Sequence, residues 1–417
     1  MSEWTLKVHY AWVIALLGFL TVLGAHGFGR FAYSLVLTDM MRELGLNEAQ
    51  MGLIATFNFI GYLALATVGG ALASRYGSRA VISLSALVMG VAMILTGLSR
   101  GFGEVLLWRF VTGMGNGGAY LPAMALPSVW FAFRMRGRAT GLVSAGIGAG
   151  FALAGVLVPV VLSAYQDLGW RYAWFYMGSA LLAIFLIDLA LLRNRPEDLG
   201  LAPLGEGGGS SQGSSRAPAA SGLAWGLVYK SRRVWMVGLA YFMYGFSYII
   251  YVTFFAHYLR SAFGWTPAEA GGLWFVSGVL SIISGVLWGW VSDALGRKYG
   301  MSLAYVVLSI SYILFALALP PYGLYASAVL FGIAAWSVPT VAVVAAADYV
   351  RPELRAAAAG FVTLFFGIGQ AIGPYAGGYL IVSTGGFQAS FLTAFLVSLL
   401  GALVSLTLKR PVGEGGG

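Results

Sequence analysis

Two arginines lie inside long apolar stretches of the chain, and their chemistry is the most specific that the sequence offers. Arg30 and Arg109 are these residues. A charged side chain costs about 2.5–3.5 kcal/mol at the centre of a membrane helix, so a buried arginine indicates a function. Because an arginine can hold a carboxylate with two parallel hydrogen bonds, we predict that Arg30 binds an anion. The alternative is that Arg30 extends toward a membrane surface or pairs with Asp39 or Glu43.

Polar and aromatic residues at helical spacing extend this candidate site. His26 lies about one turn before Arg30, and Tyr33 nearly one turn after it, on the same helix face. Further along the chain, aromatic residues recur every three or four positions, at Tyr241, Tyr244, Tyr248, Tyr251, Phe255 and Tyr258. Such a stripe is usually packing, but tyrosine hydroxyls need partners and therefore favour a cavity over lipid.

A cationic half-site that faces an aromatic half-site would suit a small organic anion with an apolar body. The residues predicted to bind the substrate are Arg30, His26, Tyr33, Asn58, Asn116, Tyr120, Tyr248, Tyr251, Trp336 and Gln370. Each polar member could instead form an interhelical hydrogen bond, which contributes about 0.6 kcal/mol on average.

The composition shows which elements must position these residues. Of 417 residues, 59% are hydrophobic and 9% are charged, and the mean hydropathy is +0.83. Soluble chains are about 25% charged, so a soluble enzyme or a nucleic-acid-binding protein is excluded. The chain has no cysteine and three dispersed histidines, at positions 9, 26 and 257, so we expect no metal site. No cofactor and no catalytic residues are predicted.

Continuous apolar runs of about 20 residues predict transmembrane helices, because lipid cannot hydrogen-bond an open backbone. We therefore expect an all-α integral membrane protein with twelve spans. The first run is long and lacks a cleavage signal, so it is interpreted as a span. The predicted spans are 11–36, 50–73, 80–98, 103–126, 139–163, 171–192, 234–258, 268–290, 299–319, 323–346, 357–383 and 387–408.

Lysine and arginine gather in alternate loops, which predicts the orientation of the chain. They are concentrated in segments 75–79, 134–138, 193–233, 297–298, 351–355 and 409–410. With these segments inside, both termini are cytoplasmic in a cytoplasmic (inner) membrane. The net charge of +9 is thereby explained by topology, and no nucleic-acid partner is needed.

The chain consists of two similar halves joined by a polar segment. GFGRFAY at 27–33 corresponds to GFSYIIY at 245–251, and GIG at 146–148 corresponds to GIG at 367–369. We therefore predict six-helix bundles over 1–192 and 233–417, with a flexible cytoplasmic linker at 193–232. Parallel repeats of this kind are a transporter architecture with the substrate near the bilayer midplane.

Two loops in equivalent positions of these halves resemble a known signature. The sequence after span 8 is Gly289-x-x-x-Asp293-x-x-Gly296-Arg297-Lys298, and its degenerate copy after span 2 is Gly70-x-x-x-Ser74-Arg75-x-Gly77-x-Arg79. With Arg109-x-x-x-Gly113-x-Gly115 in span 4, the chain resembles the major facilitator superfamily over nearly its whole length. Parts of it are also similar to oxalate and monocarboxylate carriers.

This resemblance implies a mechanism. Spans 1, 4, 7 and 10 line the central cavity in the superfamily. The resemblance implies that the two loops, with Arg109, have gating or structural roles, and that Asp293 lies near the start of span 11. The residues so assigned are Gly70, Arg75, Arg79, Arg109, Gly289, Asp293, Arg297 and Lys298.

We therefore expect a secondary transporter that moves a small organic anion, such as a carboxylate, by alternating access. The alternatives are an efflux pump for hydrophobic compounds and a membrane sensor. The expected partners are the anionic substrate, the lipid bilayer and, as an open alternative, protons, with the protein as a monomer. We expect no deep carboxylate, since Glu104 and Asp188 lie near span ends. Proton coupling would then need His26, an acid at a span edge or the substrate itself.

Overall fold

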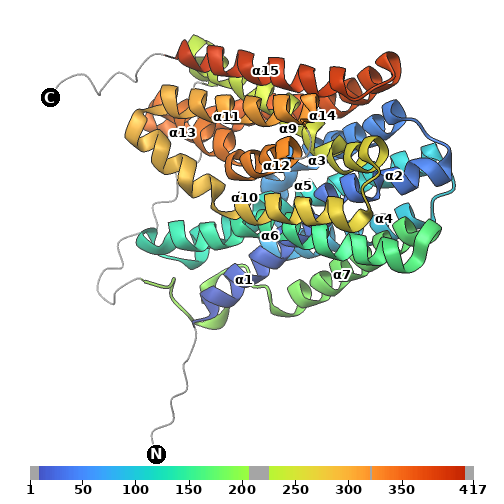
Figure 1. Ribbon diagram of the computed structural model, residues 1–417. Coiled ribbons are helices and arrows are strands. Elements are labelled where there is room, and N and C mark those ends of the chain that lie inside the picture. Colours follow the sequence, from blue (N-terminus) through green and yellow to red (C-terminus); the bar gives the residue numbers. More distant parts are fainter. Residues whose placement is uncertain (1–8, 206–224, 320–321, 409–417) are drawn as a thin grey trace, which may run out of the picture.

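The computed structural model describes residues 9–205, 225–319 and 322–408, which are almost entirely helical (Figure 1). The first half forms α1 (Tyr10–Val22), η1 (Leu23–Phe31), α2 (Tyr33–Leu44), α3 (Glu48–Tyr76), α4 (Ser78–Leu98), α5 (Phe102–Trp130), α6 (Phe133–Tyr165), η2 (Gln166–Leu168), α7 (Gly169–Leu191) and η3 (Pro196–Leu199). The second half forms α8 (Trp225–Tyr229), α9 (Arg232–Phe263), α10 (Pro267–Leu295), α11 (Arg297–Leu317), α12 (Tyr322–Ala334), α13 (Ser337–Asp348), η4 (Pro352–Leu354), α14 (Arg355–Thr384) and α15 (Gln388–Leu406).

The helices fit the twelve predicted spans. Ten helical stretches of the described chain are long and apolar enough to cross a membrane, and one of them, Phe133–Leu191, contains both α6 and α7. Counting α6 and α7 separately, and adding the 29-residue α5, gives twelve. The predicted all-α class is therefore confirmed.

The first span differs from the single helix predicted over 11–36. It runs from Tyr10 to Leu44 and changes from α-helix to π-helix over Leu23–Phe31. This segment contains Gly24, Gly27 and Gly29, which relax the steric limits on the backbone. A Cβ on Gly27 would lie 2.4 Å from the Cα of Gly150, so glycine is required for this approach of η1 to α6. The prediction missed the π-helix, because hydropathy indicates a helix without indicating its type.

Matching turns show the duplication in the backbone. Gly45 and Gly264 end the first span of each half with φ values of +64° and +69°. Capping boxes follow each of them, from Asn47 to Gln50 and from Thr266 to Glu269. Gly77 and Gly296, in the two signature loops, have φ values of +87° and +86°. Such positive φ values favour glycine, which explains the glycine in both loops.

The halves meet along two main helix pairs, α6 with α10 and α3 with α14, and α2 also packs against α9. In Figure 1 the first half (blue to green) lies below the second (yellow to red). Small residues allow the close approach. A Cβ on Gly378 of α14 would lie 2.2 Å from the carbonyl oxygen of Glu48, at the start of α3.

The two ends of the bundle are named here for reference. The termini face is the end where α1 begins at Tyr10 and α15 ends at Leu406, on the left of Figure 1. The far face is the opposite end, which carries the turns at Gly45 and Gly264.

The segment predicted as a flexible linker is partly packed. Leu204 pairs with Phe131 in an isolated bridge, and its backbone bonds to Trp130 and Ala132 at 3.0 Å each. Residues 225–229 form α8. The Gly/Ser-rich centre, 206–224, lies outside the described residues, so the division at 193–232 stays a prediction.

The Gly378 contact predicts a stability difference between two substitutions on the same helix. Gly378→Ala should force α14 away from Glu48, and overpacking of this kind costs about 1–3 kcal/mol. Gly360→Ala is the matched control, because nothing lies within 4 Å of a Cβ there. Thermal unfolding in detergent should show a lower melting temperature for Gly378→Ala alone. Equal melting temperatures would contradict the close packing.

Candidate functional site

Arg30 is the centre of the candidate site. Its side chain comes from the π-helical segment η1, and the residue is only 8% exposed. The guanidinium lies between the rings of Phe59 and Tyr62 on α3, with its Cζ 4.5 Å from each ring centroid. Among the described residues, its Nε and Nη2 have no hydrogen-bond acceptor. Arg30 is therefore held by aromatic faces, while two of its polar atoms stay free to bind a ligand.

The acids that could have neutralised Arg30 are engaged elsewhere. Asp39 pairs with Arg42 and Arg260, and Glu43 pairs with Arg171. The alternative in which Asp39 or Glu43 holds Arg30 is thus not realised in this structure. Sequence reasoning missed Phe59 and Tyr62, whose spacing of three on α3 was the only signal available for them.

His26 and Tyr120 lie beside Arg30 in the first half. Their rings are 4.3 Å apart, and the charge of Arg30 acts on both side chains. Asn116 donates a hydrogen bond to the carbonyl oxygen of Ala25 in η1. The Nδ1 of His26 and the Oδ1 of Asn116 are buried without a partner in the described chain. These atoms add hydrogen-bonding capacity next to the cation.

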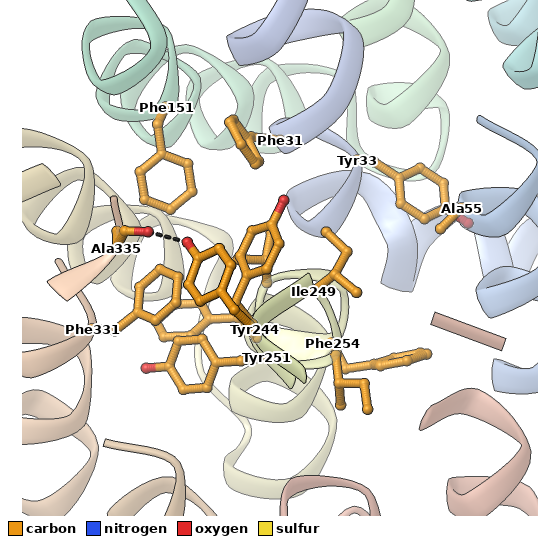
Figure 2. Packing of buried hydrophobic residues seen from close by; sticks show 14 of the residues in the cluster. Phe31, Tyr33, Ala55, Phe151, Tyr244, Ile249, Tyr251, Phe254, Phe331 and Ala335 are labelled. Atoms are coloured by element: carbon orange, nitrogen blue, oxygen red, sulfur yellow. Dashed lines mark hydrogen bonds between the residues drawn. The ribbon is translucent and has the colours of Figure 1, made fainter. Parts of the chain in front are cut away.

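The second half presents an aromatic wall. Tyr244 and Tyr248 stack with ring centroids 4.7 Å apart, and Tyr248 accepts a hydrogen bond from Gln370. The ring of Trp336 lies 6.4 Å from Tyr248 and 5.7 Å from Phe31 of the first half. Figure 2 shows Tyr244 directed at the carbonyl group of Ala335, with Phe31 on the same side.

This wall also holds unpaired polar atoms. The Nε1 of Trp336 and the Oε1 of Gln370 are buried without a hydrogen-bond partner among the described residues. The charge of Arg30 reaches Tyr248 across the interface between the halves. The structure therefore brings Arg30, His26, Asn116, Tyr120, Tyr248, Trp336 and Gln370 around one region between the halves.

Tyr33 and Asn58 lie on the other side of Arg30, against Arg109. The hydroxyl of Tyr33 donates to the carbonyl oxygen of Met51 at 2.8 Å, and Asn58 donates to the carbonyl oxygen of Arg109 at 2.8 Å. With Arg30, they line a small cavity that has room for about one water molecule. Figure 2 shows Tyr33 turned away from Tyr244 and toward Ala55.

Arg109 is a second buried cation. Its Cζ lies 5.2 Å from the ring of Tyr33 and 4.7 Å from the ring of Trp174, and its Nε and Nη1 have no described acceptor. Since Arg109 and Arg30 line the same small cavity, their charges repel each other. An anion or water near both would relieve this repulsion.

Tyr251 is not brought to this region. Its hydroxyl hydrogen-bonds with Ser327 on α12 at 2.9 Å, and its ring packs 4.6 Å from that of Phe331. Three residues along a helix turn the side chain by about 300°, which leaves Tyr251 about 60° from Tyr248 around α9, on the side that contacts α12. The prediction treated the stripe as one surface, whereas α12 packs against this part of it.

Asp188 lies near the end of its helix, as the sequence predicts, but its complete burial was not expected. Asp188 on α7 is fully buried and accepts a hydrogen bond from Thr21 of α1 at 2.8 Å, while its Oδ1 is unpaired. It lies four residues from the end of its predicted span. Packing of α1 over α7 buries it, and such packing cannot be read from hydropathy.

The degenerate loop after α3 forms local contacts at the termini face. Ser74 donates to the carbonyl oxygen of Gly70 at 2.9 Å, and Arg75 lies over the ring of Tyr76. Arg79 donates its backbone N–H to the Oδ1 of Asn194 at 2.9 Å.

The intact loop after α10 forms a charged bridge within the second half. Arg297 donates to Asp293 of the same loop and, at 3.2 Å, to Asp348 at the end of α13. Asp293 is 67% exposed and bonds to Arg297, and among the described residues no hydrogen bond or ion pair joins it to the start of span 11. Gly289 lies near Thr340 of α13, and Lys298 lies over the ring of Tyr299.

Comparisons with known sequences place the chain among membrane transporters. A family model described as "Uncharacterised MFS-type transporter YbfB" matches residues 22–406. A probable sulfoacetate transporter of Cupriavidus necator is 27% identical and covers 88% of this chain and 86% of its own. A probable galactarate/D-glucarate transporter of Escherichia coli is 24% identical, covering 96% of this chain and 93% of its own. A hexuronate transporter of Bacillus subtilis is 23% identical, covering 92% and 91%.

Solved structures share the fold. A bacterial homologue of the human lysosomal transporter Spinster, described as inward-facing and unoccupied, superposes with a TM-score of 0.78 at 16% identity, covering 98% of both chains. A D-xylose–proton symporter superposes with a TM-score of 0.77 at 15% identity, covering 97% of this chain and 99% of its own.

The bridge at Arg297 yields a test of the termini-face loop. Asp293→Asn should weaken one arm of the bridge, far from the buried region around Arg30, and so change turnover of a bound substrate more than its affinity. A change of about two- to fivefold in the maximal transport rate is expected for a surface ion pair. Glu353→Gln, in the nearby η4, is the control. Transport rates in liposomes would decide, and unchanged turnover would remove the loop from gating.

Proposed function

The chain belongs to the major facilitator superfamily, in the MFS-type transporter family whose model it matches, and on that premise we propose that it carries a small organic anion by alternating access. It is a multi-pass membrane transporter and not an enzyme. The family does not identify the substrate, so the proposed substrate class depends on the chemistry of the site.

A single observation carries the proposal of an anion. Arg30 is buried between the two halves with two unpaired N–H groups. Asp39 and Glu43, the acids that follow it in the sequence, are paired with other cations. An uncompensated guanidinium in a protein interior is costly, so an anionic group bound to it would be stabilised. The planar fork of N–H donors suits a carboxylate or a sulfonate.

Unpaired hydrogen-bond acceptors near Arg30 indicate which kind of organic anion the site would bind. The Oε1 of Gln370, the Oδ1 of Asn116 and the Nδ1 of His26 can each accept a hydrogen bond. A substrate with hydroxyl groups would satisfy them, and the aromatic wall would cover its carbon skeleton. The relatives named for sulfoacetate, galactarate or D-glucarate, and hexuronate carry acidic substrates, which supports an organic acid here as well.

Alternating access requires that one end of the bundle closes while the other admits substrate. Side-chain hydrogen bonds between the halves gather at the far face, where Asp39, Glu48 and Ser34 contact α9. We assign the termini face to the cytoplasm of a cytoplasmic membrane, because the basic segments lie at that end. The conformation would then be closed to the outside.

Two other functions remain as competitors. An efflux pump for hydrophobic compounds would use the aromatic wall of Tyr244, Tyr248 and Trp336. Many such compounds are cationic, however, and the positive charge of Arg30 would repel them. A membrane sensor would bind the same anion without moving it. Uptake of labelled anion into liposomes separates a carrier from a sensor, and competition with cationic dyes tests efflux.

A substrate screen is the first experiment. Purified protein would be heated with sulfoacetate, D-glucarate, galactarate and a hexuronate, since a ligand that binds only the folded state raises the melting temperature. Compounds that stabilise the protein would then be tested for counterflow in liposomes. Stabilisation by hydrophobic cations and by none of the acids would favour the efflux alternative.

Substitutions at Arg30 test the proposal directly. Arg30→Ala should weaken binding of the anion by about 10- to 100-fold, because a hydrogen bond to a charged group contributes about 1.5–3 kcal/mol. Arg30→Lys should restore binding only in part, since an ammonium group cannot reproduce the fork. The measurement is the affinity for the anion, in detergent and in liposomes.

The exposed Arg100 provides a matched control for these variants. Arg100→Ala removes the same charge at a loop and should leave the affinity unchanged. Retention of full affinity in Arg30→Ala, with the protein folded by its melting curve, would reject Arg30 as the anion site.

A further inference from the structure

A cluster of polar side chains ties the halves together at the far face. Asp39 of α2 holds Arg260 of α9 through two hydrogen bonds of 2.5 and 3.0 Å. Arg42 shares this carboxylate at 3.0 Å. The side chains of Asp39 and Arg260 are only 12% and 10% exposed, which makes the pair less screened than a surface pair.

A histidine forms the second part of this cluster. The Nδ1 of His257 on α9 lies 3.0 Å from the Oγ1 of Thr38, and its Nε2 lies 3.4 Å from the Oε1 of Glu48. The imidazole side chain is 2% exposed and packs 5.3 Å from the ring of Phe387. We call Thr38, Asp39 and Glu48 of the first half, with His257 and Arg260 of the second, the far-face latch.

We propose that protonation of His257 strengthens the far-face latch, so that acidity on that side of the membrane favours the conformation closed at the far face. The inference concerns regulation and rests on the proposed alternating-access cycle. Histidine is suited to this role because its charge changes between about pH 5 and pH 8 in an unperturbed environment.

The direction of the effect follows from the groups that face His257. From the first half, Thr38 of α2 and Glu48 of α3 contact it, while Asp39 and Arg42, further along α2, pair with each other and Asp39 with Arg260. From the second half, Arg260 lies one turn away on α9, while Phe387 and Gln388 at the start of α15 are uncharged. Glu269, on α10, accepts hydrogen bonds from Thr266 at the start of the same helix.

Opening the far face would separate His257 from Glu48 and Arg260 from Asp39, since each of these contacts joins the two halves. When His257 is protonated, its Nε2–H and the carboxylate of Glu48 form a charged pair, and opening the far face breaks that pair. A proton bound to His257 therefore favours closure. Raising the pH at the far face should accordingly release the latch.

The latch has a route to solvent. A cavity of about 560 Å³ opens beside it and is lined by Asn47, Glu48, Tyr258 and Phe387. Protons can therefore reach the Glu48–His257 pair in the closed conformation. His26, in the substrate region, does not line this cavity, so the two histidines can be tested separately.

The chain has no cysteine, so a pair of spin labels can be introduced cleanly. Asp167→Cys and Ser383→Cys place one exposed label on each half at the far face. The distance between the labels would be measured in lipid nanodiscs, without substrate, from about pH 5 to about pH 8. The separated population is expected to grow about fivefold over this range, a typical coupling between two sites.

Variants identify the residue responsible. His257→Gln keeps a polar amide but does not titrate, so the pH response should disappear. Glu48→Gln keeps His257 but removes its charged partner, so the response should become smaller. His9→Gln is the matched control: His9 caps α1 at the termini face, and its loss should leave the response intact.

Some results would overturn the proposal. They are a wild-type distance that does not depend on pH, a response of opposite sign, or a response that persists unchanged in His257→Gln. Because the distances are measured without substrate, failure of the latch and failure of the anion proposal give separate results.

Discussion

A cation buried in a lipid-embedded helix bundle is the constraint on which this structure depends. Arg30 has no acid partner in the part of the chain that the structure describes, and it lies between the rings of Phe59 and Tyr62. It lies in the π-helical segment η1, and the close approach of η1 to α6 requires glycine at Gly27. Local backbone geometry and interhelical packing therefore meet at the side chain that we propose as the anion site.

Duplication gave the protein two similar scaffolds with different interiors. The turns at Gly45 and Gly264, and at Gly77 and Gly296, have nearly the same backbone conformation. The first span became a broken helix with a cation, whereas its counterpart α9 is a continuous helix with tyrosines. The asymmetry creates a cationic and an aromatic half-site that meet where the halves join.

The polar contacts divide between the two ends. At the far face they cross between the halves, through the far-face latch. At the termini face, Arg297 bridges Asp293 and Asp348 within the second half. Contacts that cross the interface must break when that end opens, while contacts within one half can move with it as a rigid unit. In the proposed cycle, opening the far face would therefore break ion pairs, whereas movement at the termini face would leave the Arg297 bridge intact.

The sequence by itself determined the class of protein, the twelve spans, the duplication and the signature loops, and it singled out Arg30. Hydropathy, glycine at positive φ and repeated motifs are properties of local segments, so they can be recognised along the chain. The tertiary structure alone decided that Tyr251 packs against α12, that Asp188 is buried by α1, and that Phe59 and Tyr62 enclose Arg30. These outcomes depend on which helices become neighbours, and the distances between residues far apart in sequence are fixed only when the helices pack.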